Sequence, residues 1–303
     1  MPGPDFYREV RGLIKSDLLI DEPMKLHTSW RIGGPADIFV DPVGAEDLGL
    51  LLKQAVLHNI PITVIGAGSN MLVRDGGIRG LVIRIGSGFS DISIEGTAIT
   101  AGGGVKLSRL AAAARDACIG GLEFLAGIPG TVGGAVVMNA GANGSSVSAL
   151  VSKVVCIDYN GNTVRLEKEE MGWGYRTSGL QDRDLIVIEA VFNGYRRGRE
   201  EISSDMERNL RVRKEAQPLE LPNSGSVFKN PPGNYAGKLI QEAGCQGLRV
   251  GDAQVSTKHA NFIVNLGGAR ASHVLELIEE VKARVRARAG VTLEMEVKVL
   301  GCD

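Results

Sequence analysis

The sequence has almost no net charge and very little cysteine. Its 303 residues carry 34 Lys and Arg against 35 Asp and Glu, a formal net charge of −1. A chain without an excess of positive charge creates no field that would attract nucleic acid or an anionic membrane. We therefore expect a small-molecule partner and no nucleic acid. The four cysteines have no C-x-x-C spacing, which favours buried or incidental thiols and fits a reducing compartment.

Signals for secretion, membrane insertion and metal binding are also scarce. The N-terminal residues include no apolar stretch and read Pro2, Pro4, Asp5, Arg8 and Glu9 among others. We therefore expect no signal peptide and a cytoplasmic location. Residues 124–152 carry no formal charge, but six glycines and Pro129 interrupt any spanning helix, so this segment is expected to be a loop without membrane insertion. The four histidines lack H-x-x-x-H or H-x-x-E-H spacing, so no metal site is expected.

Glycine, in contrast, is abundant. It supplies 41 of the 303 residues, nearly twice the usual share of about 7%. Hydrophobic residues make up 44% and charged residues 23%, as in ordinary folded proteins, and the length predicts roughly two domains. Many of the glycines are clustered, and a residue without Cβ lets the backbone approach a ligand closely. We therefore expect phosphate-binding loops.

Hydrophobic periodicity and turn signals predict a mixture of helices and strands. Helices are expected at 5–19, 45–58, 106–118, 203–216, 236–243 and 272–289. Strands are expected at 37–40, 62–65, 81–85, 91–95, 97–101, 185–192, 261–265 and 291–299, with a hairpin over 153–167 that turns at Asn160-Gly161. Ser272 should cap the last helix and Gly290 should end it. The charged stretch Gly194–Glu201 is the expected domain boundary.

The first candidate binding loop, GAGSN at 66–70, directly follows the strand expected at 62–65. Successive N–H groups in a glycine-rich turn bind anions, and Ser69 and Asn70 add donors suited to a pyrophosphate. The Rossmann pattern is not met, because Met71 replaces the third glycine and the next residues look extended rather than helical. A tight turn that serves only packing is the alternative.

The second candidate loop, GIPGTVGG at 127–134, continues to Asn139-Ala140-Gly141. With so many glycines and so few charges, it could form a wall against a flat, largely uncharged ring system and its phosphates. Two such loops in one chain support each other. The alternative is again a pair of tight packing turns.

Three further segments contain candidate catalytic side chains. Ser226 lies in GSVFKNP and could be a nucleophile, a proton donor or an ordinary loop donor, although the G-x-S-x-G pattern is absent. Arg176, among aromatic and hydroxyl residues, could clamp a carboxylate, or it could be a surface arginine. Glu296 shares one face of the expected last strand with Glu294 and Lys298, a face that could equally be a solvated surface.

Taken in order, these segments resemble the UDP-N-acetylenolpyruvoylglucosamine reductase family, from Thr28 to Glu296. The resemblance implies an α+β fold. An FAD-binding domain of the vanillyl-alcohol-oxidase type would occupy residues 1–200, as two α+β subdomains of about 1–85 and 86–200. A smaller α+β substrate-binding domain would occupy 201–303, with Glu296 on its last strand. The short interval between Arg176 and Ser226 is similar to the subclass that lacks an inserted tyrosine-bearing loop.

The resemblance also implies the cofactor and the binding residues. FAD would be bound non-covalently, NADPH would be the co-substrate, and the substrate would be a UDP-linked sugar. The implied FAD-binding residues are Arg31, Gly66, Ala67, Gly68, Ser69, Asn70, Ile128, Pro129, Gly130, Thr131, Gly133 and Gly134. The implied substrate-binding residues are Tyr175, Lys214, Lys229, Asn230 and Asn261.

The implied reaction belongs to the synthesis of peptidoglycan precursors. A hydride passes from NADPH to the flavin and then to the vinyl carbon of UDP-N-acetylglucosamine enolpyruvate, which gives UDP-N-acetylmuramate. Arg176 would hold the carboxylate and its developing charge, Glu296 would help to bind and polarise that end, and Ser226 would donate the proton. Because a free serine is a weak acid, we hypothesise that Lys229 or another nearby donor lowers the pKa of Ser226.

Two positions depart from the family pattern. Met295 stands where the family usually has proline, and Asn143 where it often has an aromatic residue.

Two other functions are alternatives to the reductase. One competing function is a flavin oxidase of the same fold with a covalently tethered flavin; no histidine lies in either glycine-rich loop to form the tether. The other is a non-catalytic flavin-binding module, which the joint presence of the three candidate catalytic residues disfavours. The sequence does not predict an oligomeric state.

Overall fold

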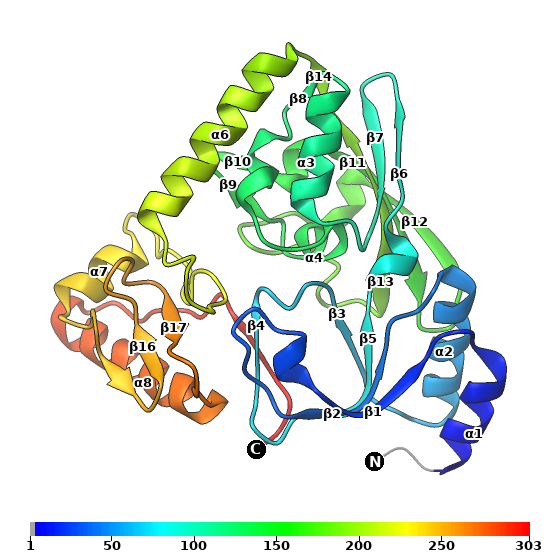
Figure 1. The fold of residues 1–303 in the computed structure, drawn as a ribbon, viewed down its shortest axis with the longest axis horizontal. Helices are drawn as coiled ribbons and strands as arrows, with labels where there is room; N and C mark the ends of the chain where they lie inside the picture. The colour runs from blue at the N-terminus through cyan, green and yellow to red at the C-terminus, as the bar shows by residue number, and fades with distance from the viewer. Residues whose placement is uncertain (1–3) are drawn as a thin grey trace. The chain divides into compact units, whose positions relative to one another are not determined.

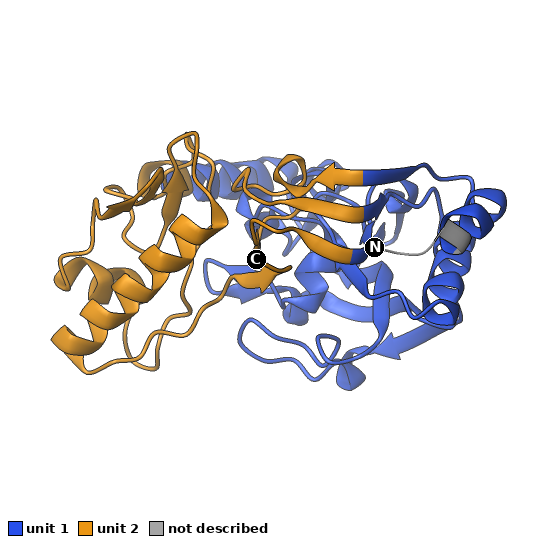
Figure 2. Ribbon diagram, turned by 90° about the horizontal axis from the view of Figure 1, so that it is seen from below, with its two compact units in different colours: residues 1–20, 38–67, 80–212 blue, residues 21–37, 68–79, 213–303 orange. Residues whose placement is uncertain are grey.

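A computed structural model describes residues 4–303 (Figure 1); Pro2, on which part of the signal-peptide argument rests, lies outside them. The chain divides into two compact units, coloured in Figure 2. Unit 1 comprises residues 1–20, 38–67 and 80–212, and unit 2 comprises residues 21–37, 68–79 and 213–303. This division differs from the contiguous domains expected at 1–200 and 201–303, because unit 2 includes two short segments from the first third of the chain. One crossing between the units lies inside the GAGSN loop, after Ala67.

The larger sheet of unit 1 is a five-stranded antiparallel sheet, in the order β12-β11-β13-β7-β6 (Figure 1). Its strands are β6 (Ile92–Glu95), β7 (Ala98–Gly102), β11 (Val151–Asp158), β12 (Thr163–Glu167) and β13 (Leu185–Asn193). The predicted hairpin at 153–167 is confirmed, and Gly161 in its turn has a φ of 79°. The predicted helix at 106–118 is also confirmed as α3 (Leu107–Asp116), whose Leu107, Leu110, Ala111 and Ala114 are buried in the core beside this sheet.

The rest of unit 1 contains α1 (Pro4–Leu13), α2 (Ala45–Leu57) and β3 (Ile62–Ile65). A four-stranded sheet has the order β1-β2-β5-β3, and the division into units falls within β1 (Leu18–Pro23), β2 (Pro35–Val40) and β5 (Ile78–Arg84). The helix expected at 5–19 is too long, because residues from Leu18 onward form β1. The N–H groups of Lys15 and Ser16 donate to the carboxylate of Asp47 at 2.9 Å instead of continuing the helix.

The expected loop at 124–152 is wrong, because it contains helical segments. They are the 3₁₀ helix η3 (Glu123–Gly127), α4 (Val132–Val137) and α5 (Val147–Leu150), with the short strands β9 (Gly141–Ala142) and β10 (Ser145–Ser146) between them. Burial of Val132, Ala135 and Val136 in the core outweighs the poor helix propensity of the glycines in α4. None of the helices in residues 4–303 combines the length and the apolar character needed to cross a membrane.

In unit 2, α8 (Ala271–Ala289) packs on a three-stranded antiparallel sheet, and α7 (Ala236–Glu242) packs against α8 (Figure 1). The sheet consists of β15 (Arg249–Val250), β16 (Ala253–Val255) and β17 (Ile263–Asn265). Gly290 ends α8 with a φ of 70°, as predicted. Ser272 does not cap its start: the helix begins one residue earlier, and the carboxylate of Asp75 accepts the N–H groups of Ala271 and Ser272 at 2.8 and 3.0 Å.

The remaining elements are short, apart from α6 (Arg199–Ala216), which runs across the division after Val212. They are η1 (Met24–Leu26), β4 (Met71–Val73), η2 (Ser87–Phe89), β8 (Ile119–Gly120), η4 (Lys168–Met171), β14 (Tyr195–Arg196) and β18 (Lys298–Leu300). The last strand expected at 291–299 is shorter than predicted. Only Lys298–Leu300 forms a strand, which pairs with β4 in parallel, and Met295 forms an isolated bridge with Phe228.

Candidate functional site

In unit 1 the two predicted glycine-rich loops meet at Gly66 and Thr131. A Cβ added to Gly66 would lie 2.4 Å from the Oγ1 atom of Thr131, so a larger residue at this position would force the buried Thr131 side chain to move. Thr131 is buried, and its Oγ1 has no hydrogen-bond partner within residues 4–303. A buried hydroxyl without a partner costs free energy. A ligand that supplies an acceptor, such as a phosphate oxygen of FAD, fits this position.

In the second loop, Gly133 is packed closely against backbone, whereas Gly134 has space beside it. The N–H of Gly133 donates to the carbonyl of Gly103 at 2.8 Å, and a Cβ at Gly133 would lie 3.2 Å from that oxygen. A Cβ at Gly134 would meet only Thr131 Oγ1, at 3.8 Å. Gly130, with a φ of 147°, holds a conformation that residues with a Cβ rarely adopt. Ile128 and Pro129 lie between η3 and this glycine.

A third glycine cluster, which was not predicted from the sequence, lies at 102–104. A Cβ at Gly103 would lie 2.4 Å from the carbonyl oxygen of Val187, and one at Gly104 would lie 1.9 Å from that of Gly86. Three consecutive glycines after a predicted strand were a visible signal of close packing. They allow the second loop to pack directly on the backbone at the end of β7.

In unit 2 the remainder of the GAGSN loop packs on segments that are distant in the sequence. Gly68 has a φ of 63°, and a Cβ there would lie 1.9 Å from the carbonyl oxygen of His27. The carbonyl of Ser69 accepts a hydrogen bond from Ser224 Oγ at 3.0 Å, and Asn70 Nδ2 donates to the carbonyl of Glu296 at 3.2 Å. No helix follows the loop, because β4 begins at Met71, as the departure from the Rossmann pattern predicted.

Arg31 belongs to a segment that the core of unit 2 holds firmly. The neighbouring Trp30 is fully buried, and its Nε1 donates to the carbonyl of Ile263 at 2.8 Å. Arg31 itself is exposed and has a φ of 55°. Positive φ is uncommon outside glycine, asparagine and aspartate. The segment thus presents an exposed guanidinium from a fixed backbone.

Ser226 and Glu296 lie on two antiparallel segments of unit 2. The N–H of Glu296 donates to the carbonyl of Val227 at 2.8 Å, and the N–H of Lys229 donates to the carbonyl of Glu294 at 2.9 Å. Phe228 and Met295 form the bridge between these hydrogen bonds. Ser226 and Glu296 are both half-buried. The pairing therefore places the two predicted catalytic residues at the same end of the bridge.

Asn261 fixes the same segment from the other side. It is 4% exposed, its Nδ2 donates to the carbonyl of Phe228 at 2.8 Å, and its Oδ1 accepts the N–H of Phe228 at 3.0 Å. Burial lowers the pKa of the adjacent His259 below its usual value of 6.5, so its ring is neutral at pH 7. Its Nδ1 accepts the N–H of Asn261 at 3.2 Å. The amide of Asn261 is thus engaged with the backbone that follows Ser226.

The other predicted substrate-binding residues of unit 2 lie near its surface. Lys229 Nζ pairs with Glu294 Oε1 at 2.5 Å, and Asn230 Oδ1 accepts the N–H of Ala236 at 3.0 Å, at the start of α7. Lys214 is exposed near the end of α6. Asn230 is exposed as well, so its side-chain amide N–H groups face away from the core.

Arg176 and Tyr175 form the tip of a tight turn in unit 1. Gly174 and Thr177 bracket the turn through two backbone hydrogen bonds of 3.0 and 3.3 Å. Arg176 has a φ of 57°, and its guanidinium carbon lies 5.3 Å from the centre of the Tyr175 ring. This distance is within the range of a cation–π contact.

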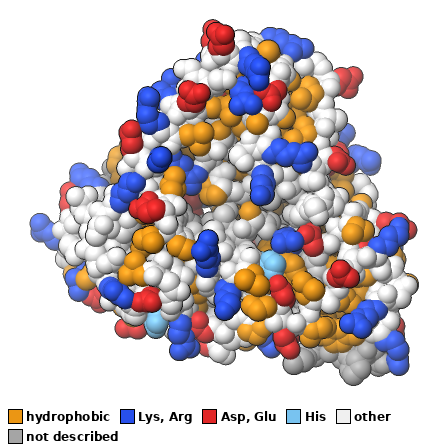
Figure 3. Space-filling view, viewed as in Figure 1, with side chains coloured by type: hydrophobic (Ala, Val, Ile, Leu, Met, Phe, Trp, Pro, Cys, Tyr) orange, Lys and Arg blue, Asp and Glu red, His pale blue; other side chains and the backbone are white. Residues whose placement is uncertain are grey.

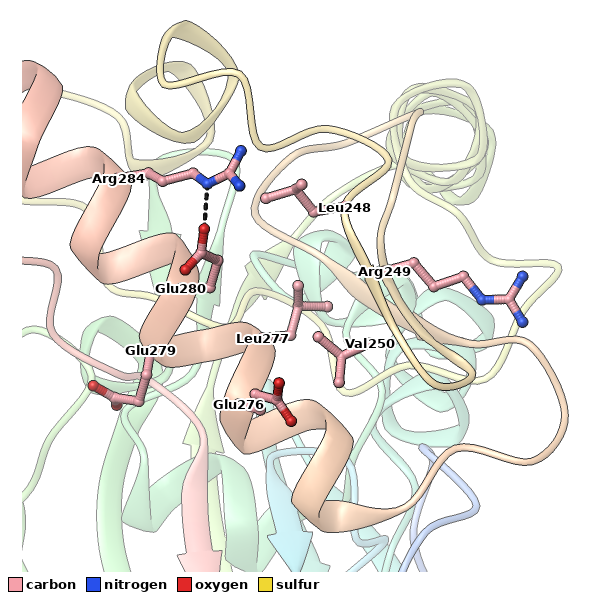
Figure 4. Close-up of a pocket in the computed structure, with 8 residues that line it drawn as sticks. All are labelled: Leu248, Arg249, Val250, Glu276, Leu277, Glu279, Glu280 and Arg284. Atoms are coloured by element: carbon pink, nitrogen blue, oxygen red, sulfur yellow. Dashed lines mark hydrogen bonds and ion pairs between the residues drawn. The ribbon is translucent and has the colours of Figure 1, made fainter.

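A surface hollow in unit 2, drawn in Figure 4, contains none of the predicted site residues. Its volume is about 510 Å³, and its lining comes from α8 and the segment around β15. Arg284 Nε pairs with Glu280 Oε1 at 2.5 Å along this wall.

On the face seen in Figure 3, positive and negative side chains are interspersed, in keeping with their nearly equal numbers. Neither the hollow nor this face of mixed charge adds a candidate for catalysis.

Two family models match the chain. The model of an FAD binding domain matches residues 36–167, and the model of the UDP-N-acetylenolpyruvoylglucosamine reductase C-terminal domain matches residues 217–300. Among curated relatives, the UDP-N-acetylenolpyruvoylglucosamine reductase of Desulforamulus reducens is 50% identical over 295 residues, which cover 97% of each chain. The reductase of Heliobacterium modesticaldum is 50% identical over 281 residues, 92% of this chain and 90% of that protein.

Comparison with solved structures also finds a UDP-N-acetylenolpyruvylglucosamine reductase. The crystal structure of UDP-N-acetylenolpyruvylglucosamine reductase from Thermus caldophilus matches with a TM-score of 0.82 at 38% identity, over 95% of this chain and all of that one. An alkyldihydroxyacetonephosphate synthase matches with a TM-score of 0.51 at 16% identity, over 65% of this chain and 41% of that one. The second match reflects a shared fold alone.

Proposed function

Because the chain belongs to the UDP-N-acetylenolpyruvoylglucosamine reductase family, it is an FAD-dependent oxidoreductase of peptidoglycan precursor synthesis, and we propose the following roles for its side chains. Its fold is α+β, with an FAD-binding domain of the vanillyl-alcohol-oxidase type. Its reaction converts UDP-N-acetylglucosamine enolpyruvate to UDP-N-acetylmuramate, with NADPH as co-substrate. A UDP-sugar partner and a cytoplasmic site of action belong to the same proposal.

FAD is held without a covalent bond by the two glycine-rich loops and the segment at Arg31. The unpartnered Thr131 Oγ1 supports this assignment, because it is a buried hydroxyl donor. It lies beside Gly66, which has no Cβ to crowd it. The remaining cofactor-binding residues of the proposal are Ala67, Gly68, Ser69, Asn70, Ile128, Pro129, Gly130, Gly133 and Gly134. Backbone N–H groups of such loops bind phosphate oxygens.

When bound, FAD would supply the hydride chemistry, by which a hydride of NADPH reaches the terminal vinyl carbon of the substrate. The addition leaves negative charge on the carbon beside the carboxylate, and this charge is delocalised as an enolate. Arg176 stabilises that charge through its guanidinium, and Glu296 binds and polarises the same end of the substrate. Ser226 then donates its proton to the charged carbon and completes the product.

Substrate binding is assigned to five further residues. Tyr175 stacks on the Arg176 guanidinium and offers an exposed ring. Asn230 and Lys214 offer exposed amide and ammonium groups for the diphosphate, and Lys229 offers a third donor. Asn261 acts through the backbone of Phe228, because both of its amide atoms are engaged there.

The backbone pairing of Glu296 with Val227 is the observation that best supports the catalytic assignment, because it brings the main chain at Glu296 beside the segment that contains the predicted proton donor. The test is an anaerobic visible spectrum of the purified protein. It is recorded for the protein alone, then after NADPH is added, and then after the UDP-linked enolpyruvyl sugar is added. A flavin band that bleaches with NADPH and returns with the sugar is expected. A band that returns only with dioxygen would identify an oxidase. A protein that takes up no flavin would contradict the FAD assignment and both flavin activities.

A further inference from the structure

The turn that carries Arg176 is exposed at its tip. Tyr175 is 57% exposed, and Arg176 holds a left-handed backbone conformation that non-glycine residues rarely adopt. Such a conformation persists only when the surrounding structure imposes it. Hydrogen bonds at the base of the turn contribute to that constraint.

Hydrogen bonds from three side chains connect that base to a single short segment, Val137–Asn139, at the C-terminal end of α4. Asn139 Nδ2 donates to the carbonyl of Gly174 at 2.8 Å. Ser178 Oγ donates to the carbonyl of Val137 at 2.8 Å. Gln181 Nε2 lies 3.2 Å from the same carbonyl and 3.3 Å from the carbonyl of Arg176. These hydrogen bonds therefore involve residues on both sides of Arg176, Gly174 before it and Ser178 after it.

Asn139 is the central member of this group. It is 7% exposed, and its Oδ1 accepts the N–H of Ser148 at 3.0 Å while its Nδ2 holds Gly174. Its own φ is 42°, a region that asparagine tolerates better than most residues. Leucine or alanine at 139 would lose both hydrogen bonds, and a charged residue there would be buried. The position therefore demands the amide.

We propose that Asn139 is a positioning residue that sets the place of Arg176 through the carbonyl of Gly174, with Ser178 and Gln181 as its partners. The inference rests on the role proposed for Arg176. It has a further consequence, because α4 begins just after Thr131 and ends at this segment. One helix of six residues thus joins a flavin-binding loop to the support of the arginine.

The decisive variant is Asn139→Asp. It keeps the size of the side chain, its tolerance of positive φ and the acceptor for the N–H of Ser148, but it loses the donor to Gly174. Asn59→Asp is the matched control, because Asn59 has a φ of 54°, is exposed and lies at the end of α2. The two half-reactions are followed separately by anaerobic stopped-flow absorbance.

We expect Asn139→Asp to slow reoxidation of the flavin by the UDP-enolpyruvyl sugar by about 10²-fold, the scale on which small misplacements act. Flavin reduction by NADPH should stay within about twofold, since it does not need Arg176. Lowering the pH should partly restore reoxidation, because a protonated carboxyl group is again a donor. Equal slowing of both half-reactions, or of neither, would overturn the inference.

Two further measurements separate positioning from general damage. In an Arg176→Ala background, Asn139→Asp should cause no additional slowing, whereas a full multiplicative loss would contradict action through Arg176. In the FAD-free protein, Asn139→Asp should accelerate hydrogen exchange of the amides in 172–181, and Asn59→Asp should not. Unchanged exchange in this segment would also refute the proposal.

Ser178→Ala decides the question if Asn139→Asp does not fold. It removes one hydrogen bond from the same support and should slow reoxidation selectively, by about 10-fold. Unaltered reoxidation would overturn the inference. The wild-type protein separates the proposed function from the positioning role. If the sugar does not reoxidise its flavin, the proposed function fails. Normal reoxidation in the wild type and in the variants rejects only the positioning role.

Discussion

The backbone N–H of Glu296 donates a hydrogen bond of 2.8 Å to the carbonyl oxygen of Val227, the residue that follows Ser226. These residues are about seventy positions apart in the sequence, and Phe228 pairs with Met295 beside them. The pairing is made by the backbone, so it tolerates Met295 at the position where proline is more usual. The serine and the glutamate are therefore held in a fixed register.

The first prediction concerns the proton donor. Ser226→Ala should leave flavin reduction by NADPH unchanged and slow reoxidation by the enolpyruvyl substrate by about 10²- to 10⁴-fold, the usual contribution of a positioned proton donor. Single-turnover absorbance under anaerobic conditions measures both steps. Ser204→Ala, on the exposed side of α6, is the control and should alter neither. Equal slowing of both steps would remove Ser226 as the specific donor.

The second prediction concerns the contact between Gly66 and Thr131. Gly66→Ala places a methyl group 2.4 Å from Thr131 Oγ1, so the Thr131 hydroxyl must move from its present position and FAD should bind at least about 10-fold more weakly. The ratio of flavin to protein absorbance and a titration of the FAD-free protein measure this. Gly12→Ala is the control, because nothing lies within 4 Å of a Cβ there. Undiminished affinity in Gly66→Ala would show that these loops do not hold the cofactor.

The third prediction concerns Asn261. Asn261→Ala leaves the N–H and the carbonyl of Phe228 without their present partners, and we expect it to lower the free energy of unfolding by about 2–4 kcal/mol. Urea unfolding followed by circular dichroism measures the change. Asn234→Ala should have a smaller effect, because the side chain of half-buried Asn234 accepts a local hydrogen bond from the adjacent N–H of Tyr235. Similar stability of the two variants would contradict a bridging role for Asn261.

The fourth prediction concerns acid stability. Burial by itself raises the pKa of Asp75, but hydrogen bonds from Ser272 and Ala271 and the charge of Arg270 outweigh it, so the pKa lies below its usual value of 3.8. The folded chain therefore binds the proton more weakly than the unfolded chain. The stabilisation is fully present above about pH 4 and is lost as the pH falls through the folded-state pKa.

Asp75→Asn tests this expectation. The free energy of unfolding should fall by about 1 kcal/mol at pH 7, as for other lost helix caps, and the loss of stability below pH 4 should become shallower. Asp91→Asn, at an exposed position, provides the comparison. An acid transition as steep in Asp75→Asn as in the wild type would exclude Asp75 as a source of the pH dependence.

The fifth prediction concerns the thiols, all four of which are free. Burial raises the pKa of Cys156 to about 12, so almost none of it is thiolate at pH 8 and it should not react with a maleimide in the native state. Exposed Cys302 should react readily. Mass spectrometry of peptides from native and denatured protein distinguishes the two, and rapid native labelling of Cys156 would show that the sheet around β11 opens.

Local chemistry determined most of the secondary structure. The hairpin at Asn160-Gly161 and the end of α8 at Gly290 follow from residues that favour positive φ. The apolar face of α3 follows from its helical spacing. The segments that carry Arg176, Ser226 and Glu296 could also be recognised in the sequence, because they contain unusual combinations of residues in a fixed order.

Tertiary structure decided what those signals could not. Residues 132–137 form a helix despite two glycines, because the core supplies more free energy than the propensity costs. The carboxylate that caps α8 comes from Asp75, about two hundred residues away, and the amide that supports the turn of Arg176 comes from Asn139. Neither partner could be read from local sequence, because a hydrogen bond depends on distance in space, and only the folded chain brings such groups together.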